Sequence, residues 1–299
     1  MRTKFINQLL EEARTNDKIF LIVGDLGYHV VEPFAESFPD RFLNIGIAEQ
    51  NMIGVATGLA LTGYNVFVYS IGNFPTLRCM EQVRNDIAYH HANVKIISVG
   101  AGYAYGCLGA THQATEDIGA MRVIPNMVVA TPGDPIETET IAKMSSTYEG
   151  PMYIRLGKAG EKIVHTGKLD KLEIGDILSL KENGNTTAVI ACGSILGQAN
   201  SSIEIKNLPY DLYSAPFIKP LNKQQLKIIA KAHPNGLIVM EEHQKSCGAG
   251  AAIIELLRDM YNAGELSELP KVKRLAINDE FLSVVGSQHY LREIAGITL

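Results

Sequence analysis

The chain has 299 residues, of which 46% are hydrophobic and 20% charged, a composition typical of a globular protein with room for two ordinary domains. The formal net charge of −5 gives no reason to expect nucleic acid or an anionic membrane as a partner. No apolar run approaches the roughly 18–20 residues of a membrane-spanning helix, and the first residues lack the apolar core of a signal peptide. Four scattered cysteines without metal-like spacing predict reduced thiols in a cytoplasmic protein.

Apolar runs and amphipathic stretches alternate through the first 160 residues. Residues 3–15 place Phe5, Ile6 and Leu9 on one face of a helix. Residues 18–23 form a short, continuous apolar run of the kind that a buried parallel strand shows. Further strands are predicted at 42–46, 64–70, 94–99, 127–130 and 152–156, and further helices at 49–61, 75–91 and 134–148. This β/α alternation predicts a mostly parallel sheet covered by helices.

A polar, glycine-bearing stretch separates this region from a second one of the same style. Strands are predicted at 188–192, 210–213, 236–240 and 272–277, with helices from residue 196 and at 222–232, 248–262 and 287–295. The expected fold class is therefore α/β, with two domains of mostly parallel sheets flanked by helices. The predicted domains are residues 1–160 and 181–299, and the predicted linker is 161–180.

The first domain is organised around residues 41–54. A strand-like run ends here and a helix rich in small residues begins, so Glu49 falls in the first turn of that helix, at the carboxyl edge of the predicted sheet. Open α/β sheets bind their ligands at this edge. A carboxylate also gains from the positive end of a helix dipole, so a lone acid here would equally fit an ordinary helix-start signal.

The residues around Glu49 carry a resemblance to a known family. Residues 38–52, Phe-Pro-Asp-Arg-Phe-Leu-Asn-Ile-Gly-Ile-Ala-Glu-Gln-Asn-Met, resemble the pyrimidine-domain motif of the transketolase and deoxyxylulose-phosphate synthase family. Further similar motifs follow in the same order: Glu-Gln-Val-Arg-Asn-Asp (81–86), Gly-Ala-Thr-His-Gln (109–113), Val-Ile-Pro-Asn-Met (123–127) and Ala-Pro-Phe-Ile-Lys-Pro-Leu (215–221). The resemblance implies a thiamin diphosphate-binding pyrimidine domain followed by a transketolase C-terminal-like domain.

In that family, the glutamate that matches Glu49 contacts the aminopyrimidine ring of thiamin diphosphate. It promotes the imino tautomer, which then takes the proton from the thiazolium carbon. The resemblance therefore implies that Glu49 is both a catalytic and a cofactor-binding residue.

One family motif is missing. Thiamin diphosphate enzymes hold the pyrophosphate through Mg²⁺, bound by a Gly-Asp-Gly that is followed by an Asn pair, because this hard cation needs oxygen ligands. The chain contains no Gly-Asp-Gly, so no metal ligand is predicted in it. The resemblance then implies the C-terminal subunit of a split transketolase, whose N-terminal partner subunit holds the metal and the pyrophosphate. Self-association through both domains and a two-plus-two assembly are expected, and the chain alone should be inactive.

The resemblance also assigns residues around the cofactor. Ile47 and Phe74 would lie beside it, with Phe74 offering a flat face to the aminopyrimidine. His112 would donate to a hydroxyl of the donor sugar or move a proton near neutral pH. Each assignment has an ordinary alternative, since Phe before a helix is often packed in a core and a loop His is often a structural hydrogen bonder.

Three further residues are candidates for binding sugar or sugar-phosphate substrates. Arg155 and Arg2 match family arginines that reach a phosphate, for which a guanidinium fork is suited, although ion pairs would explain each of them equally. His29 is the third candidate. Two departures bear on substrate choice: Leu108 replaces an aspartate that contacts the donor, and Gly100 replaces a phosphate-binding histidine.

These residues predict a transferase that moves a two-carbon ketol unit between a ketose donor and an aldose acceptor. Leu108 and the synthase-like Ala-Glu-Gln at 48–50 keep open a thiamin enzyme that uses a 2-oxo acid, as deoxyxylulose-phosphate synthase or the beta subunits of oxo-acid dehydrogenases do. A noncatalytic regulatory subunit is the third alternative, against which the retention of Glu49 argues.

Overall fold

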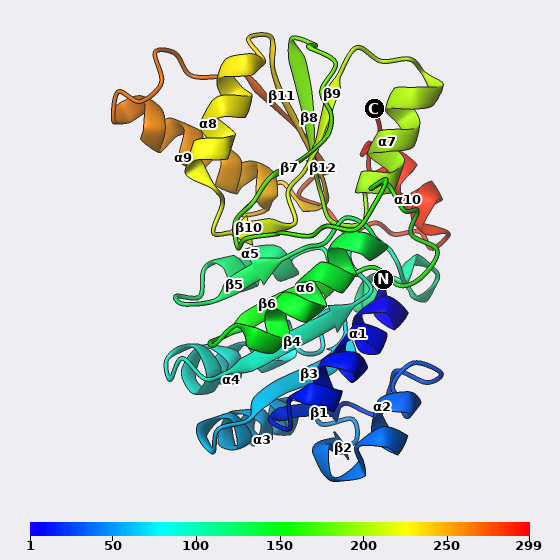
Figure 1. Ribbon diagram of the computed structural model, residues 1–299. Coiled ribbons are helices and arrows are strands. Elements are labelled where there is room, and N and C mark those ends of the chain that lie inside the picture. The colour runs from blue at the N-terminus through cyan, green and yellow to red at the C-terminus, as the bar shows by residue number, and fades with distance from the viewer.

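The computed structural model describes residues 1–299 and contains two sheets, one above the other (Figure 1). The first has seven strands in the order β10-β5-β6-β4-β3-β1-β2, and the second five in the order β12-β11-β8-β9-β7. Every neighbouring pair is parallel except β10–β5 and β7–β9. The predicted α/β class with two mostly parallel sheets is therefore confirmed.

Helices cover both faces of the first sheet. Successive strand residues point to opposite sides, so each face presents its own set of apolar side chains to the helices. Val66 and Val68 of β3 belong to the apolar cluster that includes α3, whereas Phe67 and Tyr69 belong to the cluster that includes α1 and α6. The strands are β1 (Ile19–Val23), β2 (Phe42–Asn44), β3 (Asn65–Ile71), β4 (Val94–Val99), β5 (Val128–Ala130) and β6 (Met152–Leu156). The helices are α1 (Arg2–Thr15), α2 (Glu32–Ser37), α3 (Glu49–Leu61), α4 (Met80–Gln82), α5 (Asp117–Arg122) and α6 (Pro135–Thr147).

The second sheet repeats this plan, with α8 and α9 on one side and α7 and α10 on the other (Figure 1). Its strands are β7 (Leu178–Lys181), β8 (Thr187–Cys192), β9 (Asp211–Ser214), β11 (Gly236–Gln244) and β12 (Val272–Ile277). Its helices are α7 (Leu196–Ile205), α8 (Lys223–Ala232), α9 (Ala249–Asn262) and α10 (Gln288–Ile294). One apolar cluster of 37 buried residues includes side chains from both sheets. No helix combines the length and the apolar character that crossing a bilayer requires.

The strand β10 (Phe217–Lys219) departs from the sequence prediction. It follows β9 in the chain, yet it pairs with β5 at the edge of the first sheet. Lys219 reinforces this crossing, because its ammonium donates to the backbone oxygens of Arg122 and Ile124. Three residues are too few for an apolar period, so the pattern gave no sign of this strand.

The helix predicted at 75–91 is also different. It is divided into a 3-10 turn at Leu77–Cys79, the short α4 and a π-helical turn at Val83–Ala88. Such irregular turns are frequent at functional sites. Here the 3-10 turn begins directly after Thr76 and carries Arg78, whose position is described below.

A buried ion pair joins the two sheets. Arg155 of β6 donates from Nε to Asp117 Oδ2 at 2.7 Å, and from Nη2 to the backbone oxygen of Glu242 in β11 at 2.9 Å. Burial by itself would raise the pKa of Asp117, but the Arg155 guanidinium outweighs it and holds that pKa below its usual range. Glu242 accepts in turn from Arg292 and from the backbone N–H of Tyr103.

We predict that Asp117→Asn lowers the free energy of unfolding by about 3–5 kcal/mol, because it leaves the buried Arg155 charge without its carboxylate. Urea denaturation followed by circular dichroism measures the change. Glu11→Gln, which removes an exposed ion pair with Arg14, is the matched control and should change stability by less than about 1 kcal/mol. Equal losses in the two variants would contradict the structural role given to the buried pair.

Candidate active site at the carboxyl edge of the first sheet

Glu49 lies where three neighbouring strands of the first sheet end. The chain leaves β2 at Asn44, turns through Gly46 in a left-handed conformation (φ +77°), and enters α3 at Glu49. The side chain is only 1% exposed. Its Oε1 accepts a hydrogen bond from Ser70 Oγ of β3 at 3.1 Å. Gly24, directly after β1, lies beside this carboxylate, since a Cβ there would be in van der Waals contact with Oε1 at 3.5 Å.

Arg78 is the second partner of Glu49. Its Nη1 donates to Glu49 Oε2 at 2.7 Å, while the side chain stays 44% exposed. The guanidinium also lies over the ring of Phe74, with its central carbon 4.4 Å from the ring centroid, a cation–π arrangement. The ring of His112 meets that of Phe74 edge to face, with 5.4 Å between centroids. The structure thus brings together Glu49, Phe74 and His112, three of the residues expected from the sequence.

The loop that carries His112 is held from two sides. Asn73 Nδ2 donates to the backbone oxygen of Gln113 at 2.7 Å, and Arg155 Nη2 donates to that of Ala114 at 2.6 Å. His112 Nδ1 lies 3.0 Å from Thr111 Oγ1, whereas Nε2 has no hydrogen-bond partner within the chain. The half-buried imidazole is therefore oriented, with one ring nitrogen free for a ligand.

A cysteine lies beside this group but is not a nucleophile. Burial and, to a smaller extent, the nearby Glu49 carboxylate raise the pKa of Cys79 to about 12. Its thiol donates to the backbone oxygen of Phe74 at 3.2 Å. Because only the thiolate is reactive, Cys79 acts by fixing the turn that carries Phe74 and Arg78.

None of the other expected residues forms a hydrogen bond with Glu49, Phe74 or His112. Ile47 is 77% exposed, two residues before Glu49. His29 is exposed in a left-handed conformation (φ +63°), and only its backbone N–H is bonded, to Glu32. Arg2, at the start of α1, lies near the buried Tyr69 and opposes in part the rise of the Tyr69 pKa that burial causes. The roles of these residues stay predictions.

Arg155 is 2% exposed and its guanidinium bonds Asp117 and two backbone oxygens. Binding a phosphate would require these contacts to open. The arrangement favours a structural role, and the predicted contact with a phosphate stays a prediction.

Two sizeable cavities border the first domain, and only the smaller one is lined by a chain neighbour of Arg78. A cavity of about 520 Å³ lies between the two domains and is lined in part by Leu77, Glu116 and Phe281. Leu77 directly precedes Arg78 in the chain and is the lining residue nearest in sequence to the Glu49 cluster. His243 also lines it; burial lowers the pKa of this imidazole, and its Nε2 accepts from the backbone N–H of Gly119.

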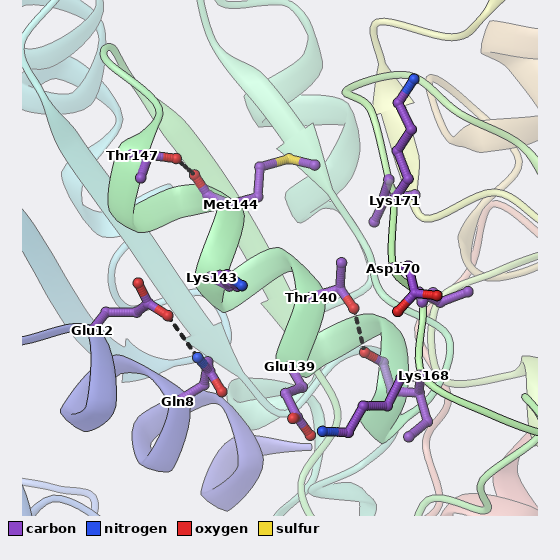
Figure 2. Close-up of a pocket in the computed structure, with 13 residues that line it drawn as sticks. Gln8, Glu12, Glu139, Thr140, Lys143, Met144, Thr147, Lys168, Asp170 and Lys171 are labelled. Carbon is purple, nitrogen blue, oxygen red and sulfur yellow. Dashed lines mark hydrogen bonds between the residues drawn. The ribbon is translucent and has the colours of Figure 1, made fainter.

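The larger cavity, of about 630 Å³, lies between α1, α6 and the segment 168–172 (Figure 2). Its polar side chains bond mainly within their own helices, as Gln8 to Glu12 and Thr140 to the backbone of Ile136. Since α1 and α6 cover the face of the sheet opposite α3, this cavity is remote from Glu49. We therefore place the candidate site by its chemistry and not by cavity size.

Sequence reasoning missed Arg78 and Ser70, the two groups that bond the Glu49 carboxylate. From the sequence alone, Arg78 is expected to be an interface or structural residue. A signal was present: a basic residue stands four positions after Phe74, in the segment that follows β3, and only β1 separates β3 from β2, the strand that precedes Glu49.

Family models and individual relatives of this chain all point to the same family. Residues 1–160 match the family model "Transketolase, pyrimidine binding domain", and residues 175–298 match "Transketolase, C-terminal domain". A "Putative transketolase C-terminal section" from Methanocaldococcus jannaschii is 34% identical over 94% of this chain and 87% of that relative. An apulose-4-phosphate transketolase subunit from Phocaeicola vulgatus is 33% identical over 86% of this chain and 83% of the relative.

A solved structure, "Split gene transketolase, inactive beta4 tetramer", superposes with a TM-score of 0.84 at 33% identity, over 99% of this chain and 93% of that one. The chain spans 46% of a 1-deoxy-D-xylulose-5-phosphate synthase from Clostridium perfringens, at 30% identity. The resemblance to split transketolases is thereby confirmed.

We predict that Arg78 and Glu49 are energetically coupled. Arg78→Met leaves a buried carboxylate without its charged partner and should lower the free energy of unfolding by about 1–2 kcal/mol, less than for a fully buried pair because Arg78 is partly exposed. Combined with Glu49→Gln, it should cost less than the sum of the two single changes, by about 1 kcal/mol. A double-mutant cycle in urea measures this coupling, and strict additivity would contradict the contact.

Proposed function

The chain belongs to the transketolase family, and we propose that it is the C-terminal subunit of a two-chain transketolase that moves a two-carbon ketol unit from a ketose or ketose phosphate to an aldose acceptor. The observation that carries this proposal is the buried Glu49 carboxylate, placed at the carboxyl edge of the sheet beside Phe74 and His112. Two relatives that are themselves a transketolase subunit and a transketolase C-terminal section, each matched over most of its length, support the two-chain form.

The residues present fit the aminopyrimidine half of thiamin diphosphate. The Arg78 guanidinium is planar, donates to Glu49 and lies over the Phe74 ring, which are the two contacts that an aminopyrimidine would make at this place. When bound, thiamin diphosphate supplies the electron sink that stabilises the two-carbon fragment. Glu49 would hold the proton at the ring, Phe74 and Ile47 would flank it, and Arg78 would give up its position.

His112 is suited to act on the substrate. Thr111 orients its Nδ1 side and Nε2 is free, so the imidazole can donate to a hydroxyl of the sugar or accept its proton. Arg2 and His29 remain candidates for phosphate or hydroxyl contacts, and Arg155 is the candidate that would need to leave its ion pair. Leu108 is 52% exposed and cannot accept a hydrogen bond, which favours a donor that differs from those of relatives with an aspartate here.

A partner subunit has to complete the site. The only group of three metal-binding side chains, Asp134, Glu137 and His165, stands at the start of α6 after β5, and four strands separate β5 from β2, which precedes Glu49. The Glu49 cluster itself therefore has no ligand set for Mg²⁺ and pyrophosphate. Exposed apolar side chains follow strands at the carboxyl edge of the first sheet, namely Tyr28, Ile47, Leu77 and Leu108. Two more follow β12 of the second sheet: Phe281, which lines a cavity with Leu77, and Val285, which lies near Gly109. Such a patch marks an interface, and we assign it to an N-terminal subunit that holds Mg²⁺ and pyrophosphate. Self-association of this chain would give a two-plus-two assembly.

A second candidate function uses the same cofactor on a 2-oxo acid. Similarity to deoxyxylulose-phosphate synthase and the apolar Leu108 favour it. Consumption of pyruvate, and not of a ketose, by the reconstituted complex would establish this alternative. We further infer a reducing, cytoplasmic location from the four unpaired cysteines, and no role with nucleic acid from the net charge of −5.

We expect thiamin diphosphate with Mg²⁺ to bind tightly only when the chain is mixed with its N-terminal partner. Titration calorimetry on the chain alone and on the mixture measures this, and thiamin monophosphate serves as the control for the pyrophosphate contact. Tight binding by the isolated chain would refute the division of the site between two subunits.

We expect Glu49→Gln to lower turnover of the reconstituted enzyme by about 10²–10⁴-fold, because an amide cannot exchange the proton at the cofactor. Partner assembly, followed by analytical ultracentrifugation, should be unchanged. Glu11→Gln, on the exposed face of α1, is the control and should keep full activity. Undiminished turnover in Glu49→Gln would exclude the cofactor role of this residue and point to a noncatalytic subunit.

A further inference from the structure

A second polar cluster lies where α6 begins, against the segment 157–177 that connects the sheets. Asp134 caps α6, its Oδ1 accepting from the backbone N–H groups of Ile136 and Glu137 at 2.8 and 2.9 Å. Its Oδ2 accepts from those of Val164 and His165 at 2.9 and 3.0 Å. One carboxylate therefore fixes the connecting segment to the helix.

Next to Asp134, several buried polar atoms have no partner. These are both ring nitrogens of His165 and Oε1 of Glu137; Glu137 Oε2 accepts from the backbone N–H of Gly133. The side chains of His165 and Glu137 are 5% and 0% exposed. Buried polar groups are nearly always hydrogen-bonded, so three unpaired atoms in one place indicate that something absent from the chain satisfies them.

The spacing of these atoms identifies the kind of occupant. The imidazole stands between two carboxylates, with Nδ1 3.6 Å from Asp134 Oδ2 and Nε2 3.6 Å from Glu137 Oε1. Both distances are too long for a hydrogen bond. They approach the separation of about 3.4 Å between two ligand atoms of a tetrahedral ion with bonds of about 2.1 Å. One ligand atom from each of the three residues lies within 4.8 Å of the others.

The charges of the buried carboxylates also favour a cation as the occupant. Asp134 and Glu137 are both fully buried, and neither forms an ion pair with a lysine or arginine. Asp134 accepts four backbone N–H hydrogen bonds, whereas the Glu137 carboxylate accepts one, and a divalent cation would supply the compensating charge that Glu137 lacks. Ser214 of β9 adds a further unpartnered oxygen, 3.1 Å from where a Cβ on Gly133 would lie.

We propose that this junction binds one divalent cation of the zinc class, with Glu137 Oε1 and His165 Nε2 as its ligands. Asp134 lies on the Nδ1 side, which is the place of the outer carboxylate in carboxylate–histidine–metal arrangements, with its Oδ2 3.6 Å from Nδ1. Ser214 Oγ or water completes the coordination. The combination of imidazole and carboxylate suits zinc better than Mg²⁺ or Ca²⁺, which prefer oxygen alone.

The consequence is a structural clamp that is separate from the cofactor's Mg²⁺. The ion would tie together three pieces of chain: α6 of the first sheet, the connecting segment and, through Ser214, β9 of the second sheet. None of its ligands belongs to the Glu49 cluster, so the site should fill in the chain alone.

The test uses the full chain without a purification tag. The protein is stripped with a chelator, titrated with Zn²⁺ by calorimetry, and analysed for bound metal by plasma mass spectrometry after gel filtration. We expect one equivalent of zinc and a higher thermal midpoint than in the stripped protein, with no rise in the same concentration of Mg²⁺. His165→Gln and Glu137→Gln should each weaken zinc binding at least tenfold and abolish the rise.

His289→Gln is the matched control. His289 lies 3.3 Å from Glu293 on the exposed face of α10, where it would attract zinc non-specifically. This variant should still take up one equivalent. Absence of zinc uptake by the wild-type chain, or equal uptake by His165→Gln, would overturn the proposal and leave a water or a shared proton as the occupant. Because the readouts need neither partner nor substrate, they are independent of the proposed transketolase activity.

Discussion

The buried contact between Arg155 and Asp117 is the interaction on which the other parts of the molecule depend. The Arg155 guanidinium reaches three segments at once: α5 through Asp117, the His112 loop through the backbone of Ala114, and β11 through the backbone of Glu242. Tyr153, also on β6, donates to the same Asp117 carboxylate. One side chain thus contributes both to the contact between the two sheets and to the orientation of a candidate catalytic loop, and these contacts occupy its Nε and Nη2 donors.

The Glu49 cluster has two features that fit the proposed division of the active site between two chains. Its carboxylate is buried, hydrogen-bonded and shielded from water, as a proton-holding group should be. The apolar side chains around it are instead exposed, and no oxygen ligands for a phosphate-bound cation stand beside it. An active site built between two chains requires both features, since the surface that the partner covers is exposed in the separate subunit.

Sequence patterns predicted the features that depend on periodicity. The α/β class and the start of α3 at Glu49 follow from apolar runs and a sheet edge, whereas the family resemblance placed Phe74 and His112 near one cofactor and did not predict the contact between their rings. Arg78 was not predicted as a partner of Glu49, because its direction depends on a 3-10 turn that no period reveals. Arg155 matched a motif, yet its contacts come from residues 38 and 87 positions away, a tertiary arrangement that local sequence does not encode.

The strand β10 makes the first sheet depend on both halves of the chain. Because the second half of the chain supplies the outermost strand of the first sheet, removing it would leave β5 as an unprotected edge with free backbone donors and acceptors. Such an edge pairs readily with other chains and promotes aggregation. The two halves of the chain therefore cannot be exchanged independently. A chimera that takes the first sheet from a relative would also have to take residues 217–219, because they form the outermost strand of that sheet.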